Sequence, residues 1–208
     1  MAHDLSRVEY VVKTITDTCI ANETYFGDLD SVVGDGDFGY SLARGFENVR
    51  AQWDTFDRAD VGTFLQKVAV VMSGRIGGTS GPIWGTAFLR AASTAKGKQE
   101  LTGADVVAML RAAIEGIKAR GNADVGDKTL LDALVPMTDT IEAQLAAGAS
   151  APEVVKAAAV AARQAAEATS TMQAMRGRAS YTGERSIGSP DPGAVAVAVI
   201  VEQIAQGW

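Results

Sequence analysis

The sequence contains very little cysteine and histidine, and these two scarcities narrow the chemistry that it can perform. Cys19 is the only cysteine among 208 residues, so no intramolecular disulfide can form and the composition suits a reducing compartment, plainly the cytoplasm. His3 is the only histidine, and it lies in a terminal segment that we expect to be mobile. Chemistry is therefore expected to depend on carboxylates, backbone amides and arginines.

The chain also lacks an excess of positive charge and a long apolar run. Lys and Arg total 19 against 25 Asp and Glu, a net charge of -6, which argues against a nucleic-acid partner and an anionic membrane surface. Residues 1–12 carry charges and lack the apolar region of a secretory signal. The longest uninterrupted apolar stretch, 194–201, is too short to span a bilayer. We expect a soluble protein that binds a small ligand or a protein partner.

Apolar residues recur at helical spacing almost everywhere, which predicts an all-α single domain over residues 1–208. Thr102 and Asp105, like Ser150 and Glu153, have the spacing of a capping box. Pro136 predicts a kink, and the alternation after residue 194 is compatible with a strand, although a lone strand would have no partner. The eight predicted helices are about 5–21, 40–53, 61–73, 82–96, 102–120, 129–147, 150–175 and 191–206.

Seven loops join eight helices, and in an up-and-down antiparallel bundle or barrel every second loop lies at the same end. The first, third, fifth and seventh loops are 34–39, 74–81, 121–128 and 177–190, and they hold the glycines, aspartates and arginines that chemistry requires. The other loops are ordinary polar connections. One end of the bundle is therefore predicted to be functional.

The first of these loops is acidic. Asp28, Asp30, Asp35 and Asp37 lie within ten positions, and carboxylates without His or Cys suit Mg²⁺ or Ca²⁺. No EF-hand register fits, because Val32 and Val33 would occupy a ligand position and the glycine position. Magnesium that also binds phosphate oxygens matches better, while an acidic turn whose aspartates serve as helix N-caps is the structural alternative.

The other three loops combine glycines with polar residues. The segment 73–82 runs into the fourth predicted helix, and its glycines, hydroxyl groups and helix N-terminus suit a phosphate; a flexible turn between helices is the alternative. The segment 121–129 resembles a Walker A loop, but Asp127 precedes the Lys-Thr pair and the loop follows a helix, so we reject that interpretation. In 176–193, Arg178 and Arg185 can pair with phosphate or with carboxylates, and Asp191-Pro192 is typical of a helix start.

Taken together and in order, these motifs resemble those of the nucleotide-binding L subunit of dihydroxyacetone kinase, the DhaL or DAK2 domain family. The resemblance covers essentially the whole chain. The motifs that carry it are Asp30, Gly34-Asp-Gly-Asp37, Gly77-Gly-Thr-Ser-Gly-Pro82, Gly126-Asp-Lys-Thr129, Arg176-Gly-Arg-Ala-Ser-Tyr181, Gly183-Glu-Arg-Ser-Ile-Gly188 and Asp191-Pro-Gly193.

The resemblance implies a barrel of eight antiparallel helices with an adenine nucleotide, ADP or ATP, at one end. It assigns two Mg²⁺ ions to Asp30, Asp35 and Asp37, and charge stabilisation to Arg178. The nucleotide would contact Phe38, Gly39, Ser41, Gly78, Thr79, Ser80, Gly121, Leu130, Arg178, Asp191, Pro192 and Gly193. The implied reaction transfers the γ-phosphoryl group to dihydroxyacetone held on a separate K subunit, and a homodimer is compatible with the family.

One position departs from the family pattern. Members that depend on the phosphoenolpyruvate phosphotransferase system usually have His-Gly after Gly-Asp-x-Asp, and ATP-consuming relatives often have Cys-Gly, whereas this chain has Phe38. The first type retains ADP and is rephosphorylated by a multiphosphoryl M subunit, and it is the type we expect here. An ATP-dependent kinase subunit for another ketose such as erythrulose, or a non-catalytic regulatory protein, are the alternatives.

Overall fold

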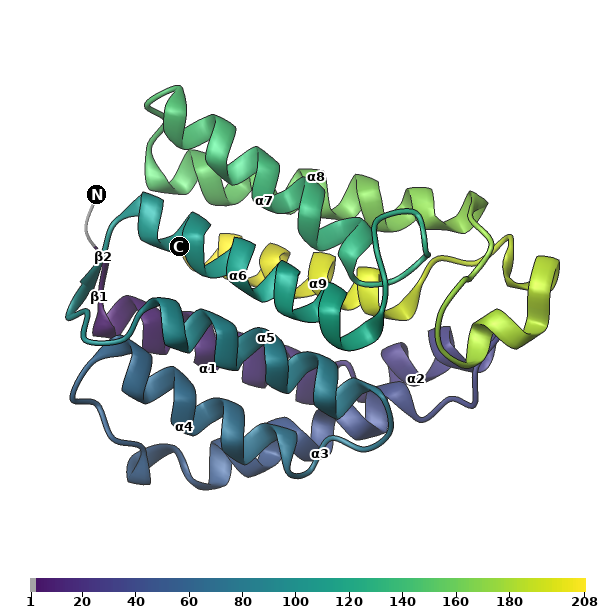
Figure 1. Ribbon diagram of the computed structural model, residues 1–208, viewed down its shortest axis with the longest axis horizontal. Coiled ribbons are helices and arrows are strands. Elements are labelled where there is room, and N and C mark those ends of the chain that lie inside the picture. Colours follow the sequence, from purple (N-terminus) through teal and green to yellow (C-terminus); the bar gives the residue numbers. More distant parts are fainter. Residues whose placement is uncertain (1–2) are drawn as a thin grey trace.

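Helices form almost all of the regular structure in the computed structural model, which describes residues 3–208 (Figure 1). Two short strands, β1 (His3–Asp4) and β2 (Glu100–Leu101), pair antiparallel. Short 3-10 turns lie at Trp53–Thr55, Thr169–Thr171 and Arg178–Ser186. The α-helices are α1 (Leu5–Ala21), α2 (Glu23–Ser31), α3 (Phe38–Ala51), α4 (Val61–Ser73), α5 (Ser80–Thr94), α6 (Gly103–Gly121), α7 (Leu131–Ala146), α8 (Ala151–Ala168) and α9 (Pro192–Gln206).

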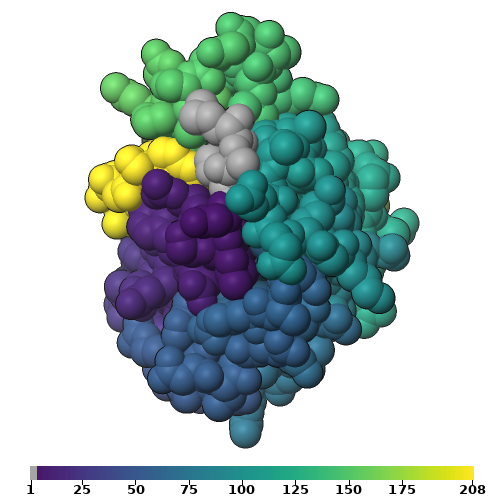
Figure 2. Space-filling model, turned by 90° about the vertical axis from the view of Figure 1, so that its left-hand side faces the viewer, coloured from purple at the N-terminus to yellow at the C-terminus, as the bar shows by residue number. Residues whose placement is uncertain are grey.

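The long helices run back and forth, so that alternate connections lie at opposite ends of the molecule (Figure 1). The connections α2–α3, α4–α5, α6–α7 and α8–α9 share the right-hand end in that view. The opposite end, which faces the viewer in Figure 2, carries the strand pair, the α7–α8 turn and the end of α9. The predicted all-α class is confirmed, as is the gathering of the four polar loops.

Helix starts follow from local side-chain chemistry. The capping boxes predicted at Thr102 with Asp105 and at Ser150 with Glu153 are both present. Asp191 accepts a hydrogen bond from the backbone N–H of Ala194 at 2.8 Å, and the following segment is helix α9 rather than a strand. These caps fix where α6, α8 and α9 begin.

Two predictions about the helices are wrong. Helix α2 was not predicted, because Phe26 is its one buried residue and no apolar stripe marks it. Helix α8 ends at Ala168 rather than near residue 175, because its alanine-rich run is followed directly by the 3-10 turn Thr169–Thr171. The backbone of His3, in the segment expected to be mobile, pairs with that of Leu101. Pro136 lies inside helix α7, and the kink predicted there stays a prediction.

The core has two different compositions. One cluster, from α1, α3, α4 and α5, is rich in large side chains such as Phe46, Phe64 and Trp84. The other joins α7, α8 and α9 through small residues such as Ala162 and Ala198, which allow close helix contact. Mainly apolar side chains from seven helices, α1 and α4 to α9, also line a cavity of about 360 Å³ between these regions. Among residues 3–208, no helix combines the length and hydropathy needed to cross a membrane.

Candidate nucleotide and metal site

A second cavity, of about 300 Å³, opens at the end of the bundle where the four polar loops meet. Its lining comes from segments that lie far apart in the sequence, so the fold alone brings them together. The lining residues are Asp30, Val33, Asp35, Asp37, Phe38, Gly77, Gly78, Thr79, Ser80, Ile83, Trp84, Ile117, Gly121, Ala123, Lys128, Thr129, Leu130, Arg176, Gly177, Arg178, Ala179, Asp191, Pro192 and Gly193.

Three carboxylates converge on one wall of this cavity. One oxygen from each of Asp30, Asp35 and Asp37 lies within 4.8 Å of the others. Asp35 and Asp37 are exposed and Asp30 is half-buried. Oxygen donors at this mutual separation fit a hard divalent cation such as Mg²⁺, which needs only a few carboxylates when phosphate or water completes its coordination.

The structure also tests the alternative that these aspartates only cap helices. Asp37 occupies the N-cap position of α3, but its side chain makes no capping hydrogen bond. Asp30 accepts a hydrogen bond from the backbone N–H of Phe38 at 3.3 Å, which orients one carboxylate oxygen. Gly34 packs against Asp30, since a Cβ atom at Gly34 would lie 2.2 Å from Asp30 Oδ1. The loop therefore holds Asp30 in place and leaves Asp37 available to a ligand.

A guanidinium group already lies against the carboxylates. Arg178 forms an ion pair with Asp35, and its Nη1 atom lies 4.0 Å from Asp37 Oδ2. This contact neutralises part of the repulsion among the three acidic groups. The three carboxylates therefore already attract one cationic group, the Arg178 guanidinium.

The glycine-rich loop leads into the N-terminus of α5 beside the same cavity. Gly78 has a φ of 61°, which glycine adopts without strain. Thr79 is the N-cap residue of α5, and its side chain makes no capping hydrogen bond. The first N–H groups of α5 therefore have no side-chain acceptor, and a helix N-terminus in this condition suits an anion such as phosphate.

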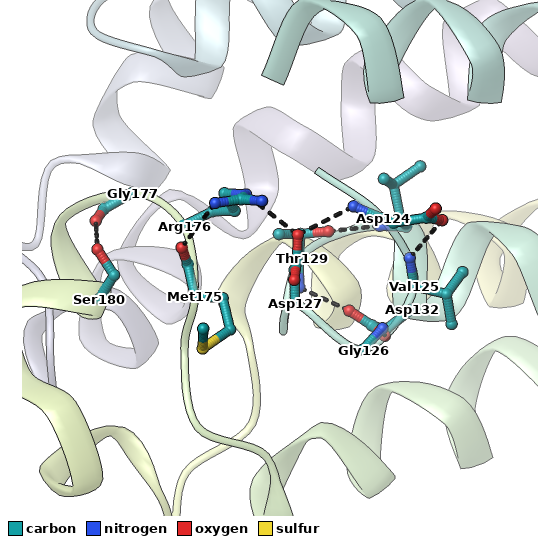
Figure 3. A network of polar contacts seen from close by, with 11 residues as sticks. Asp124, Val125, Gly126, Asp127, Thr129, Asp132, Met175, Arg176, Gly177 and Ser180 are labelled. Carbon is teal, nitrogen blue, oxygen red and sulfur yellow. Dashed lines mark hydrogen bonds and ion pairs between the residues drawn. The ribbon is translucent and has the colours of Figure 1, made fainter. Parts of the chain in front are cut away.

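The loop after α6 is held by the carboxylate of Asp132, in the first turn of α7 (Figure 3). Asp132, which is buried, accepts hydrogen bonds from the backbone N–H groups of Gly126 and Thr129 at 2.6 and 2.8 Å. The helix before this loop ends with Asn122 in the left-handed conformation, so the residue after Gly121 makes the turn. The rejection of a Walker A loop is confirmed, because a helix and not a strand precedes this segment.

The Asp191 carboxyl lies at the start of α9 in the cavity wall. Loss of hydration on burial raises the pKa of Asp191 to about 7, and the nearby Asp132 carboxylate adds to this effect. The capping N–H of Ala194 and the Lys128 ammonium act in the opposite direction. Asp191 is therefore a group whose charge changes near neutral pH.

The cavity brings most of the predicted site residues together, with two exceptions. Gly39 lies under the surface, where a Cβ atom would be 1.9 Å from the Glu23 carbonyl oxygen, so this glycine permits close contact of α2 and α3. Ser41 is buried on α3 behind the cavity wall. Phe38 reaches the cavity, but its ring packs 6.1 Å from that of Phe26 in the core.

The sequence did not identify the apolar part of the lining. Val33, Ile83, Trp84, Ile117 and Ala123 come from helices and loops whose apolar residues looked like ordinary core. No local signal separates an apolar residue that faces a ligand from one that faces another helix. Of the charged lining residues, Asp30, Asp35, Asp37, Arg178 and Asp191 were predicted, whereas Lys128 and Arg176 were not.

An all-helical fold with a carboxylate cluster, a glycine-rich helix entry and an arginine at one cavity agrees with the comparison to known protein families. The DAK2 domain family matches residues 32–206. The chain belongs to this family.

The similar proteins are kinases or kinase subunits. The chain is 39% identical over 181 residues to the PEP-dependent dihydroxyacetone kinase, ADP-binding subunit DhaL, of Escherichia coli, which covers 87% of this chain and 86% of that one. It is 38% identical over 190 residues to L-erythrulose kinase of Pectobacterium atrosepticum, covering 90% of this chain and 32% of that protein.

A solved structure has the same fold. The dihydroxyacetone kinase from C. freundii, in complex with AMP-PNP and Mg²⁺, superimposes with a TM-score of 0.79 and is 27% identical. The match covers 100% of this chain and 35% of that chain, so this protein corresponds to about a third of the solved one.

Proposed function

We propose that this chain, residues 1–208 as one domain, is the nucleotide-binding subunit of a dihydroxyacetone kinase. It would hold an adenine nucleotide through magnesium and supply the γ-phosphoryl group to dihydroxyacetone on a separate K subunit. The observation that carries this proposal is the convergence of Asp30, Asp35 and Asp37 at one cavity. The 39% identity to an ADP-binding subunit over most of both chains supports it.

The proposed roles follow from chemistry and position. Asp30, Asp35 and Asp37 would hold two Mg²⁺ ions, which when bound would neutralise the charge of the phosphates during transfer. The N–H groups at Gly78, Thr79 and Ser80 would donate to phosphate oxygens.

The remaining lining would position the rest of the nucleotide. Arg178 would leave Asp35 when metal occupies the carboxylates, and its guanidinium would then face the phosphates. Gly121, Leu130 and the Asp191-Pro192-Gly193 turn would surround the nucleotide together with the apolar lining. Phe38 contributes its backbone N–H to Asp30, while Gly39 and Ser41 support the wall from behind.

We propose that ADP stays bound to this chain and is rephosphorylated to ATP by a multiphosphoryl M subunit, and that this ATP then donates its γ-phosphoryl group and returns to ADP. Its test is to purify the protein without added nucleotide, desalt it and measure what it carries. Bound ADP supports this form. A protein that is empty after desalting but turns over Mg-ATP with a K subunit would instead support an ATP-dependent kinase, for which erythrulose is a second substrate to assay because L-erythrulose kinase is 38% identical.

The metal role has a direct test in the carboxylates. We expect Asp35→Asn and Asp37→Asn to abolish Mg²⁺-dependent ADP binding in calorimetry and to leave the far-UV circular dichroism unchanged, because both side chains are exposed. Asp28→Asn is the matched control, since Asp28 is exposed in the same segment but lies outside the cluster. Retained affinity in the first two variants would exclude the proposed metal site.

Activity requires a separate test with a partner. The purified chain is combined with a cognate K subunit, dihydroxyacetone and saturating Mg-ATP, or with the M subunit and its phosphoryl donor. Formation of dihydroxyacetone phosphate is expected. If the chain binds Mg-ADP but no transfer occurs with either donor, it is a non-catalytic nucleotide-binding regulatory protein.

A further inference from the structure

Lys128 has an unusual environment for a lysine. It is 3% exposed, and none of the ion pairs among the described residues includes it. Its Nζ atom instead donates to three backbone carbonyl oxygens, those of Met172 at 3.1 Å, Ser189 at 2.7 Å, and Ser186. An ammonium group has three donors, and each of them has an acceptor here.

The backbone conformation at position 128 is one that lysine rarely adopts. Lys128 has a φ of 60°, in the left-handed region where glycine or asparagine is favoured. A buried ammonium also costs free energy unless it is hydrogen-bonded, and burial lowers the pKa of Lys128. Neither the turn nor the burial favours lysine, so the three carbonyl contacts are the feature that accounts for it.

The three acceptors all belong to the segment that connects α8 with α9, residues 172–189. This segment contains Arg178 and leads directly into Asp191, and it has little regular structure beyond a 3-10 turn. Asp127 makes two more contacts with the same segment. Its carbonyl accepts from the Met175 N–H at 3.0 Å. Its carboxylate lies 3.1 Å from Arg176 Nε (Figure 3). Two consecutive residues, Asp127 and Lys128, thus fasten the loop after α6 to residues 172–189. The Lys128 contacts are buried, and the Asp127 contacts are more exposed.

We propose that Lys128 is a positioning residue, whose ammonium group fastens residues 172–189 to the loop after α6 and thereby places Arg178 and the Asp191 turn at the nucleotide cavity. The inference rests on the nucleotide-binding function proposed above. It also explains the Lys-Thr pair that resembles a Walker motif: the lysine binds backbone carbonyls of the neighbouring loop and is not available to a phosphate.

Limited proteolysis without nucleotide tests the fastening itself. Arg176, Arg178 and Arg185 are exposed trypsin sites inside the fastened segment. We expect Lys128→Met to accelerate cleavage at these arginines by about tenfold, because loss of the three contacts lets the segment open locally. Cleavage is assigned by mass spectrometry. The matched control is Lys156→Met, which changes an exposed lysine of α8 and should leave the rate unchanged.

Nucleotide affinity tests the consequence for the site. We expect Lys128→Met to weaken Mg-ADP binding by about tenfold in calorimetry, because an unfastened loop must be ordered again on binding, while Lys156→Met binds like the wild type. A lowered thermal midpoint with wild-type cleavage at the three arginines and affinity within twofold would overturn the proposal, because Lys128 would then only stabilise the bundle.

Two further arrangements keep the test decisive. If Lys128→Met does not fold, Lys128→Gln replaces it, since the amide keeps donors for part of the carbonyl set, and intermediate cleavage is expected. Wild-type cleavage in a folded Lys128→Gln protein overturns the proposal. If the wild type itself binds no Mg-ADP, the proposed function fails, but the cleavage rates still decide whether Lys128 fastens the segment.

Discussion

Asp37 and Lys128 show how far a single residue can be interpreted from its sequence context. The sequence left Asp37 as either a metal ligand or a helix cap, and in the structure the residue is at an N-cap position without a capping hydrogen bond. Lys128 is different. Its three acceptors lie 44, 58 and 61 residues away, so no local pattern could have predicted its environment, and its burial could be known only from the fold.

Asp191 leads to a prediction at the same scale. Because its pKa is raised to about 7 in the folded chain from an ordinary value of 3.8, the folded state binds the proton more tightly than the unfolded state. The contribution of this group to stability is therefore complete below about pH 4 and is lost as the pH rises through about 7. Asp191→Asn removes the charge and keeps an N-cap acceptor.

We expect the thermal midpoint of Asp191→Asn, relative to that of the wild type, to increase between pH 4 and pH 8 in the absence of nucleotide. The two proteins share all other titrating groups, so the difference between them isolates Asp191. The measurement is a series of circular dichroism melts at constant ionic strength. A difference that stays constant over this range would show that Asp191 titrates normally.

At the scale of elements, prediction succeeded where one apolar stripe or one cap defines a helix. The capping boxes at α6 and α8 and the Asp-Pro start of α9 were all found from spacing. Helix α2 could not be found in this way, since its stability depends on the packing of Phe26 and on close contact with α3 at Gly39. The end of α8 was misplaced because an alanine-rich run continues the helical pattern and no glycine or proline stops it.

The contact between α4 and α5 yields a prediction about packing. A Cβ atom at Gly62 would lie 2.6 Å from the Ala92 carbonyl oxygen and from the Lys96 Cα atom, which are backbone atoms that cannot rotate away. Gly62→Ala should therefore destabilise the protein by about 1–3 kcal/mol. Urea unfolding followed by circular dichroism gives the free energy of unfolding.

The control for this substitution is Gly74→Ala at the end of α4. There the nearest atom to an added Cβ is the Val70 carbonyl oxygen at 3.6 Å, an ordinary contact, and φ is -70°. We expect its free energy of unfolding to stay within about 0.5 kcal/mol of the wild type. An equal decrease in the free energy of unfolding for both variants would mean that Gly62 is not needed for the close packing of α4 against α5. Gly62 lies at the end of the bundle remote from the cavity, so the affinity of folded Gly62→Ala for Mg-ADP should not change.

At the scale of the whole molecule, the alternation of the connections between the two ends of the bundle explains why the polar loops could be predicted to lie together. Alternate connections of an antiparallel bundle share an end, so four polar loops converge whatever their internal conformation (Figure 1). The extra helix α2 did not disturb this arrangement, because it lies at the same end and leads into α3. This alternation does not predict the order of residues around the cavity. That order depends on contacts between loops, such as the ion pair of Arg178 with Asp35.

The same convergence predicts how a ligand changes the stability of the molecule. A nucleotide held by the carboxylates, the α5 entry and the segment before α9 would add contacts between connections that already meet through Arg178 with Asp35 and through Lys128. At a free concentration of about 100 times Kd, Mg-ADP should stabilise the fold by about 2.7 kcal/mol, or about 5–10 °C in thermal midpoint for a domain of this size.

Scanning calorimetry or circular dichroism melts measure this shift, and two controls define its origin. EDTA should remove the shift, because the phosphates would then face three uncompensated carboxylates, and Asp35→Asn combined with Asp37→Asn should show no shift with or without the chelator. Adenosine, which lacks phosphates, should also give almost none. If ADP raises the midpoint equally in EDTA, the nucleotide is held without metal, and the aspartates would have to be regarded as a surface cluster paired with Arg178.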